Sequence, residues 1–202
     1  MRTLIIVDVQ NDFTPGGALA VPSGDEIVPL INTLQRKFDL VVATQDWHPA
    51  DHVSFASNHE GREPFDTIDL DGLAQTLWPD HCVQGKRGAA FHPDLDIKAV
   101  EAIFRKGVDP GIDGYSGFFD NGHRKRTGLA GYLREKEARD LYFCGLAAEI
   151  CVTFTLKDAL ELGFSTTLIE DATRPLDDED FEQARRELVG NGAKIITSSD
   201  LG

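Results

Sequence analysis

Four side chains of catalytic type each follow a short apolar run of the sequence. They are Asp8, Asp46, Lys106 and Cys151. Continuous apolar runs are typical of parallel strands buried on both faces. The carboxyl ends of parallel strands share one edge of the sheet, and open α/β folds bind their ligands at that edge. The spacing therefore predicts that two acids, a lysine and a cysteine meet there.

The chemistry that this set offers is acyl transfer through a cysteine. Cys151 is expected at a helix N-terminus, where unpaired N–H groups and a nearby Lys106 lower the pKa of a thiol. Asp8 could accept the thiol proton and deliver it to a leaving amine, while backbone N–H groups hold the oxyanion. The alternative is structural: a buried cysteine, acids that cap helices or hold loops, and a lysine that reaches solvent.

A second set of residues has the composition of a metal site. Asp46 and His48 lie two positions apart, so in an extended segment their side chains point the same way. His81 would be a third ligand and would leave positions open for water or substrate, as catalytic metal sites require. Carboxylate and imidazole ligands suit zinc, iron or manganese and do not discriminate among them. Ordinary loop histidines are the alternative, and Cys82 is expected to be a buried neighbour rather than a ligand.

Aromatic side chains near the strand ends and in the irregular segment 47–96 form a third set. Phe13, Trp47, Trp78 and Tyr115 could wall a pocket for a flat ring, because pockets are commonly lined by aromatic side chains. Ordinary packing beneath loops is the alternative for each of them. An irregular segment of this length is uncommon in a compact domain and is usually functional.

The elements that must position these residues follow from the alternation of apolar and amphipathic stretches. Six strands are predicted, at residues 4–7, 40–43, 99–104, 141–144, 166–169 and 194–197. Helices are predicted at residues 25–38, 150–162 and 177–189, with a short helix around 70–77. This order indicates an α/β fold, a three-layer α/β/α sandwich around a six-stranded, mainly parallel sheet. Since no linker or repeat divides the chain, residues 1–202 are expected to form a single domain.

Composition excludes several classes of partner. The chain has 202 residues, with 34 acidic against 20 basic side chains and a formal charge of −14. That charge disfavours nucleic acid, which needs a basic surface, and also anionic membranes. Three widely spaced cysteines are a poor disulfide framework and fit a reducing compartment. The first apolar run is too short for a signal-peptide core, so a cytoplasmic protein is expected.

Five ordered motifs resemble those of the nicotinamidases (pyrazinamidases) in the isochorismatase-like cysteine hydrolase superfamily. The resemblance covers nearly the whole chain. The motifs are LIIVDVQNDF at 4–13, TQDWHP at 44–49, WPDHCV at 78–83, FRKG at 104–107 and GLAAEICV at 145–152. The resemblance implies an isochorismatase-like fold, a catalytic triad and three metal ligands. The triad falls on Asp8, Lys106 and Cys151, and the ligands fall on Asp46, His48 and His81.

The same resemblance implies further roles around the nucleophile. The peptide bond between Leu146 and Ala147 is expected to be cis, with the amides of Ala147 and Cys151 directed at the oxyanion. His52 falls where some members have an additional metal-associated histidine. Many members have Thr-Asp where this chain has Ala148-Glu149, which keeps a carboxylate but removes a hydroxyl. The positions that wall the pyridine pocket fall on Phe13, Trp78 and Tyr115.

The function implied is hydrolysis of nicotinamide to nicotinate and ammonia, a step of NAD salvage, through a thioester on the cysteine. Pyrazinamide is a second implied substrate, one divalent metal ion is the implied cofactor, and a homo-oligomer is left open. Isochorismatase-type relatives generally lack the metal ligands, so the metal motifs favour the nicotinamidase branch. Two alternatives remain: another amidohydrolase of the superfamily acting on a carbamoyl or ureido compound, and a non-catalytic member that binds a metal or a ligand.

Overall fold

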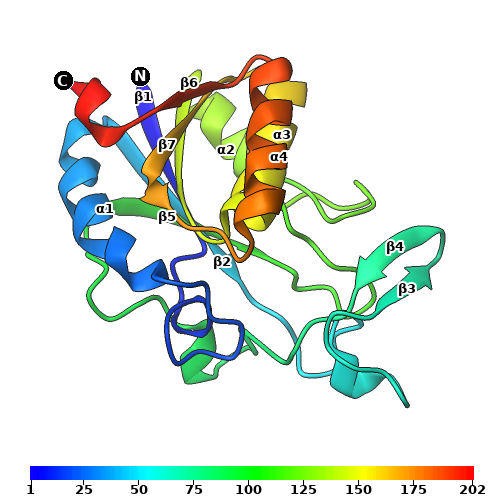
Figure 1. The fold of residues 1–202 in the computed structure, drawn as a ribbon. Helices are drawn as coiled ribbons and strands as arrows, with labels where there is room; N and C mark the ends of the chain where they lie inside the picture. Colours follow the sequence, from blue (N-terminus) through cyan, green and yellow to red (C-terminus); the bar gives the residue numbers. More distant parts are fainter.

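A six-stranded parallel sheet forms the centre of the computed structural model, which describes residues 1–202 (Figure 1). The strand order is β5-β2-β1-β6-β7-β8, and every neighbouring pair is parallel. The strands are β1 Arg2–Val7, β2 Leu40–Asp46, β5 Val100–Lys106, β6 Asp140–Gly145, β7 Ser165–Thr173 and β8 Lys194–Ile196. All six predicted strands are therefore present, with ends that differ by a few residues.

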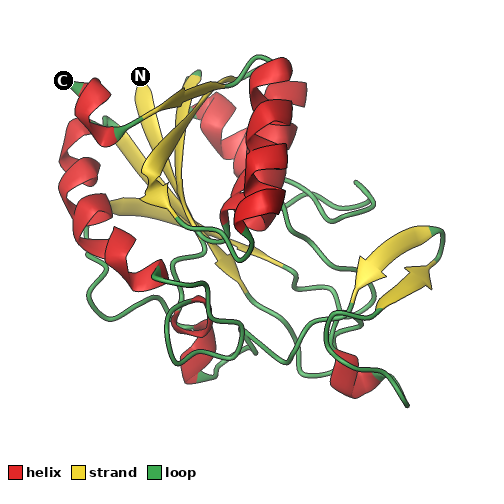
Figure 2. Cartoon of the chain, in the orientation of Figure 1, coloured by secondary structure: helices red, strands yellow, loops and turns green.

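Helices cover both faces of the sheet, which confirms the three-layer sandwich (Figures 1 and 2). The four α-helices are α1 Val28–Leu34, α2 Leu129–Glu135, α3 Thr153–Glu161 and α4 Asp178–Gly190. Successive residues of a strand point to opposite faces. On β1, Leu4 and Ile6 accordingly pack in the core beneath α1. Ile5 and Val7 pack in the other core, to which α2, α3 and α4 contribute.

The predicted helix around residues 70–77 is wrong. That segment forms an antiparallel hairpin of β3 Thr67–Leu70 and β4 Leu73–Thr76, which stands away from the main sheet (Figure 1). Asp71 and Gly72 connect the strands with φ of 54° and 83°. Two positive φ values in a two-residue loop are the requirement of the tightest hairpin turns, and Asp-Gly is a preferred sequence for them. The Asp-Gly pair was thus a signal for a hairpin, not for a helix.

The helix predictions are only partly right in detail. The stretch 25–38 is divided into a 3-10 turn at Gly24–Ile27, α1, and a second 3-10 turn at Gln35–Lys37. The helix predicted from residue 150 begins with a π-helical turn, Ala148–Val152, and continues as α3. Helix α2 was not predicted, because its seven residues give too short a pattern for periodicity to be read. No helix of the fold has the length and apolar character needed to span a membrane.

Candidate active site

The four strand-end residues meet at the carboxyl edge of the sheet, with Lys106 at their centre. Asp46 and Lys106 end the paired strands β2 and β5 directly opposite each other. The Nζ of Lys106 lies 2.9 Å from Oδ2 of Asp8 and 3.0 Å from Oδ1 of Asp46. It also lies 3.4 Å from Sγ of Cys151, in the π-helical turn after β6. The expected convergence of two acids, a lysine and a cysteine is present.

Further polar groups hold this cluster in place, and all of its members are buried. The hydroxyl of Thr44 donates to Oδ1 of Asp8 at 2.6 Å. The backbone of Asp46 is held at both ends by the amide of Gln10, which accepts from its N–H at 2.7 Å and donates to its carbonyl at 2.8 Å. Lys106 also donates to the carbonyl of Gly114 at 3.1 Å. Sequence reasoning did not identify Gln10 or Thr44, although both lie inside the motifs quoted above.

Burial dominates the protonation of the cluster. It raises the pKa of the Cys151 thiol well above the ordinary value, although the Lys106 cation opposes the rise. Burial likewise raises the pKa of Asp8 against the attraction of Lys106. Burial alone would lower the pKa of Lys106, but the carboxylates of Asp46 and Asp8 hold it well above its usual range. The lysine is therefore a permanent cation.

The expectation of a lowered pKa at Cys151 is thus contradicted. The thiol lies in a buried turn, where loss of solvent outweighs the helix N-terminus and the lysine. A thiol in this environment needs a base to become a nucleophile. Asp8 suits that task, because a carboxylate with a raised pKa is a stronger proton acceptor.

Three potential ligands converge as a metal site requires. Oδ2 of Asp46 lies 2.9 Å from Nε2 of His48 and 3.4 Å from Nε2 of His81. Each histidine donates its Nδ1 proton to a backbone carbonyl, His48 to Gly107 at 2.9 Å and His81 to Pro79 at 2.8 Å. Because a carbonyl only accepts, these bonds place a proton on each Nδ1 and turn each Nε2 toward Asp46, as the outer partners of metal ligands do. Two imidazole nitrogens and one carboxylate fit a divalent metal ion.

Gly107 is required for this arrangement. Its φ is 62°, and a Cβ at this position would lie 2.3 Å from Cε1 of His48. Only glycine lets the carbonyl of residue 107 approach the ring closely enough to accept its proton. The glycine that follows Lys106 thus supports His48, one of the candidate metal ligands.

His52 lies beside the three candidate ligands, but its nitrogens do not converge with theirs. Its ring is 4.2 Å from that of His48, centroid to centroid, but its Nδ1 is 2.7 Å from the hydroxyl of Ser54. Burial, followed by the neighbouring His48, lowers the pKa of His52 to about 4. Its ligand atoms group with those of His48 and Asp113 rather than with those of Asp46 and His81. A metal role for His52 stays a prediction.

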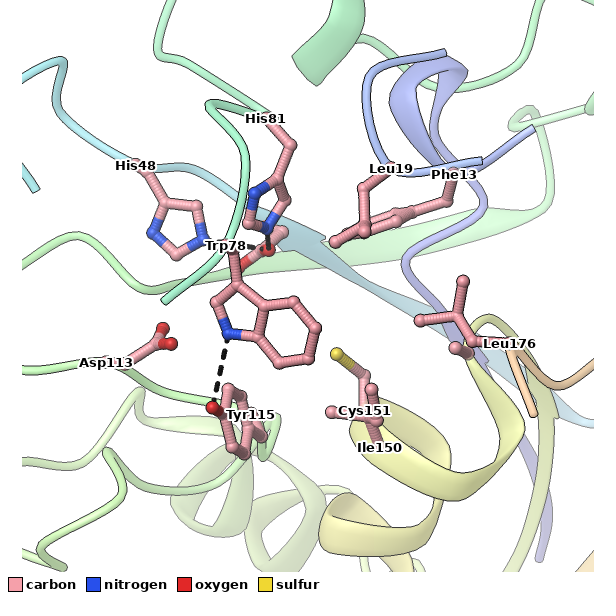
Figure 3. A pocket seen from close by; sticks show the side chains of 12 residues that line it. Phe13, Leu19, His48, Trp78, His81, Asp113, Tyr115, Ile150, Cys151 and Leu176 are labelled. Carbon is pink, nitrogen blue, oxygen red and sulfur yellow. Dashed lines mark hydrogen bonds and ion pairs between the residues drawn. The ribbon is translucent and has the colours of Figure 1, made fainter. Parts of the chain in front are cut away.

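A pocket lies between the cysteine and the histidines (Figure 3). Of the four aromatic residues singled out from the sequence, Phe13, Trp78 and Tyr115 line it. Trp47 does not, and its ring instead packs against the guanidinium of Arg105, 3.9 Å from the ring centroid. The indole N–H of Trp78 donates to the hydroxyl of Tyr115 at 3.2 Å, and their rings meet edge to face at 6.1 Å. Figure 3 shows the sulfur of Cys151 pointing into the space that these side chains enclose.

Four other lining residues were not identified from the sequence. They are Leu19, Asp113, Ile150 and Leu176. Ile150 precedes the cysteine and so had a signal in its position. The other three lie outside the regular elements, where no periodicity indicates which way a side chain faces.

The turn that carries Cys151 has the backbone that the resemblance implies. The peptide between Leu146 and Ala147 is cis. The N–H of Ala147 makes no hydrogen bond within the protein, and Ala147 lines the pocket beside Cys151. Gly145 has a φ of 116°, and a Cβ there would lie 2.0 Å from the carbonyl oxygen of Val7. Glycine is therefore the only residue that fits where β6 pairs with Val7 of β1.

Glu149 has a defined place in the same turn. One oxygen of its carboxyl group accepts from the backbone N–H groups of Leu176 and Asp177, at 2.9 and 3.0 Å. It therefore ties the nucleophile turn to the loop between β7 and α4. The departure Ala148-Glu149 keeps a carboxylate that the structure uses.

The isochorismatase domain matches residues 2–200 of the chain. The chain belongs to the isochorismatase family. It is 49% identical to the nicotinamidase of Escherichia coli (strain K12), over 98% of this chain and 96% of that one. The nicotinamidase/pyrazinamidase structure from Acinetobacter baumanii superposes with a TM-score of 0.97 at 48% identity, covering 100% and 98% of the two chains. The pyrazinamidase of Pyrococcus horikoshii in complex with zinc has a TM-score of 0.80 at 41% identity, with 97% and 98% covered.

Proposed function

We propose that the protein is a nicotinamidase, which hydrolyses nicotinamide to nicotinate and ammonia in NAD salvage and also accepts pyrazinamide. Similarity to nicotinamidases over the whole chain supports this function. The observation that carries it is the convergence of Asp8, Lys106 and Cys151 at a pocket walled by aromatic side chains. The opposite side of that pocket bears the Asp46, His48 and His81 group.

The first half of the reaction forms a thioester on Cys151. Asp8 removes the thiol proton, and the sulfur attacks the carboxamide carbon. The negative charge thereby moves from the carboxylate to the sulfur and on to the carbonyl oxygen. Lys106 contacts both Asp8 and Cys151, so its ammonium stabilises the charge on either group. The amides of Ala147 and Cys151 donate to the oxyanion.

The second half of the reaction releases the products and restores the thiol. Asp8, now protonated, gives its proton to the departing ammonia. Water then attacks the thioester carbon and Asp8 accepts one of its protons. Collapse of that intermediate breaks the C–S bond, frees nicotinate and returns a proton to the sulfur. No group is consumed, since Asp8 ends ionised and Cys151 ends as a thiol.

Asp46, His48 and His81 would hold one divalent ion, with zinc, iron and manganese all compatible with these donors. When bound, such an ion supplies a Lewis acid for the ring nitrogen of the substrate. The aromatic wall of Phe13, Trp78 and Tyr115 contributes orientation, because a flat ring between these side chains has few ways to present its carboxamide.

We further propose that residues 1–202 act as one domain in the cytoplasm, on a small-molecule substrate and without nucleic acid or membrane as a partner. The surplus of acidic side chains supports the exclusion of both polyanions. The oligomeric state is left open.

The test is the release of ammonia by purified protein from a panel of nicotinamide, pyrazinamide and a ureido compound, with and without a chelator. We expect nicotinamide and pyrazinamide to be hydrolysed, the chelator to abolish the activity, and zinc, iron or manganese to restore it. Turnover of the ureido compound alone, unaffected by chelation, would identify the other type of amidohydrolase. If no compound is turned over and Cys151 is no more thiol-reactive than Cys82 or Cys144, the protein is a binding member instead.

A further inference from the structure

A carboxylate that the mechanism does not use forms part of the pocket wall. Asp113 lies in the loop after β5, is 2% exposed and lines the same pocket as Cys151 (Figure 3). Its Oδ1 accepts from the N–H of Gly114 at 2.8 Å. Its Oδ2 accepts from the side-chain amide of Gln75, the buried residue of the β3–β4 hairpin, at 3.0 Å. These two bonds fix the carboxylate at the pocket.

The charge of Asp113 is not matched by a nearby cation. No lysine or arginine makes an ion pair with it, in contrast to Asp8 and Asp46, which share Lys106. The nitrogens of His48 and His52 come within 4.8 Å of it. His48 already uses both nitrogens elsewhere, and His52 is bonded to Ser54 through Nδ1. Both neighbours are therefore engaged by other groups.

The overall charge of the pocket bears directly on the proposed reaction. Hydrolysis converts a neutral carboxamide into a carboxylate, so the bound molecule gains a negative charge during turnover. Asp8, Asp46 and Lys106 together carry one negative charge, and a divalent ion at Asp46 would leave the pocket with one positive charge. Such a pocket would retain the anionic product, and the charge of Asp113 brings the total to zero.

We propose that Asp113 is a specificity-determining residue that weakens the binding of anions in the ring pocket. It favours a neutral carboxamide over ring compounds that carry a carboxylate or another anionic group, and it promotes release of the acid product. Gln75 donates to Asp113 from the hairpin and supports it structurally. The inference rests on the proposed nicotinamidase function, since it takes the amide and the acid as the two ligands.

The test compares the affinities of nicotinamide and nicotinate by calorimetry in the Cys151→Ala background, which prevents turnover. Adding Asp113→Asn should tighten nicotinate binding about tenfold relative to nicotinamide. This tenfold change corresponds to the interaction of two unit charges about 10 Å apart at an effective dielectric constant of about 20. Asparagine keeps the size of the side chain and an oxygen that can accept from Gln75.

Two matched variants separate charge from structure. Asp113→Glu retains the charge, and Gln75→Ala removes the amide that holds Asp113. Each should shift both affinities alike and leave their ratio within about twofold of the parent. A purely structural role for Asp113 predicts instead that Asp113→Asn also shifts both ligands alike, and that result would overturn the inference.

The charge inference and the proposed function can fail separately. If the wild type hydrolyses nicotinamide but Asp113→Asn leaves the ratio of the two affinities unchanged, the charge inference is wrong and the proposed function stands. If the wild type does not hydrolyse nicotinamide and the Cys151→Ala protein binds neither ring compound, both are wrong.

Discussion

Lys106 is the single buried cation that offsets two buried carboxylates. Its Nζ lies within 3.0 Å of an oxygen of both Asp8 and Asp46. Removing one partner from a buried ionic cluster leaves charge without compensation, which is strongly destabilising. Lys106 therefore has a structural role alongside its catalytic one.

We expect Lys106→Met to lower the free energy of unfolding by about 3–5 kcal/mol, besides abolishing activity. The matched control is Lys157→Met, which breaks the surface pair with Glu187 at 2.8 Å and should cost less than about 1 kcal/mol. Denaturant unfolding of the metal-free proteins measures both. Equal effects at the two lysines would contradict the account of the cluster.

The residues proposed to do the chemistry could be predicted from the sequence because they end strands or follow them closely. Asp8, Asp46, Lys106 and Cys151 follow apolar runs, and parallel pairing brings such positions to one edge whatever the loops do. Asp113 could not be found in this way, since its direction is set by a loop and by Gln75 from a distant hairpin. The pKa of Cys151 was missed because burial is a property of the folded site, not of the local sequence.

At the scale of elements, Glu149 joins the nucleophile turn to the loop before α4. Burial raises its pKa above the ordinary value of 4.5, although backbone N–H groups oppose the rise. The folded state therefore holds this proton more tightly than the unfolded state does. Stability from this group is complete below pH 4.5 and is lost as the pH rises through the raised pKa.

Glu149→Gln keeps an oxygen for the two backbone N–H groups but cannot ionise. We expect the variant to gain stability relative to the wild type as the pH rises from about 4.5 through the raised pKa. Urea unfolding at a series of pH values measures the difference. If the wild type instead becomes more stable relative to the variant as the pH rises over this range, the carboxyl group is not buried as described.

The hairpin shows where element prediction failed and why. The stretch 70–77 has too few apolar residues for periodicity to decide between helix and strand, so the Asp71-Gly72 pair was the stronger signal. The strands at the centre of the sheet were predicted correctly, because a buried parallel strand carries a continuous apolar run. Short helices such as α2 depend on tertiary packing and leave little trace in the sequence.

At the scale of the whole molecule, the formal charge of −14 contrasts with the balance inside the site. The acidic excess belongs mostly to solvated side chains, whereas Asp8 and Asp46 share a lysine. A neutral carboxamide is not steered by the surface field. We therefore expect kcat/KM for nicotinamide to change less than about twofold between low salt and 0.5 M salt, a range in which screening would alter the capture of a charged substrate markedly. A steep dependence on salt would indicate an ionic substrate instead.

The central claim is that Cys151 is the nucleophile of an amide hydrolysis. The most direct measurement is ammonia release from nicotinamide by the wild type, by Cys151→Ala and by Cys144→Ala, which removes a buried cysteine outside the pocket. We predict activity in the wild type and in Cys144→Ala, and a loss of at least about a thousandfold in Cys151→Ala. Ammonia release by Cys151→Ala at the wild-type rate would contradict the account.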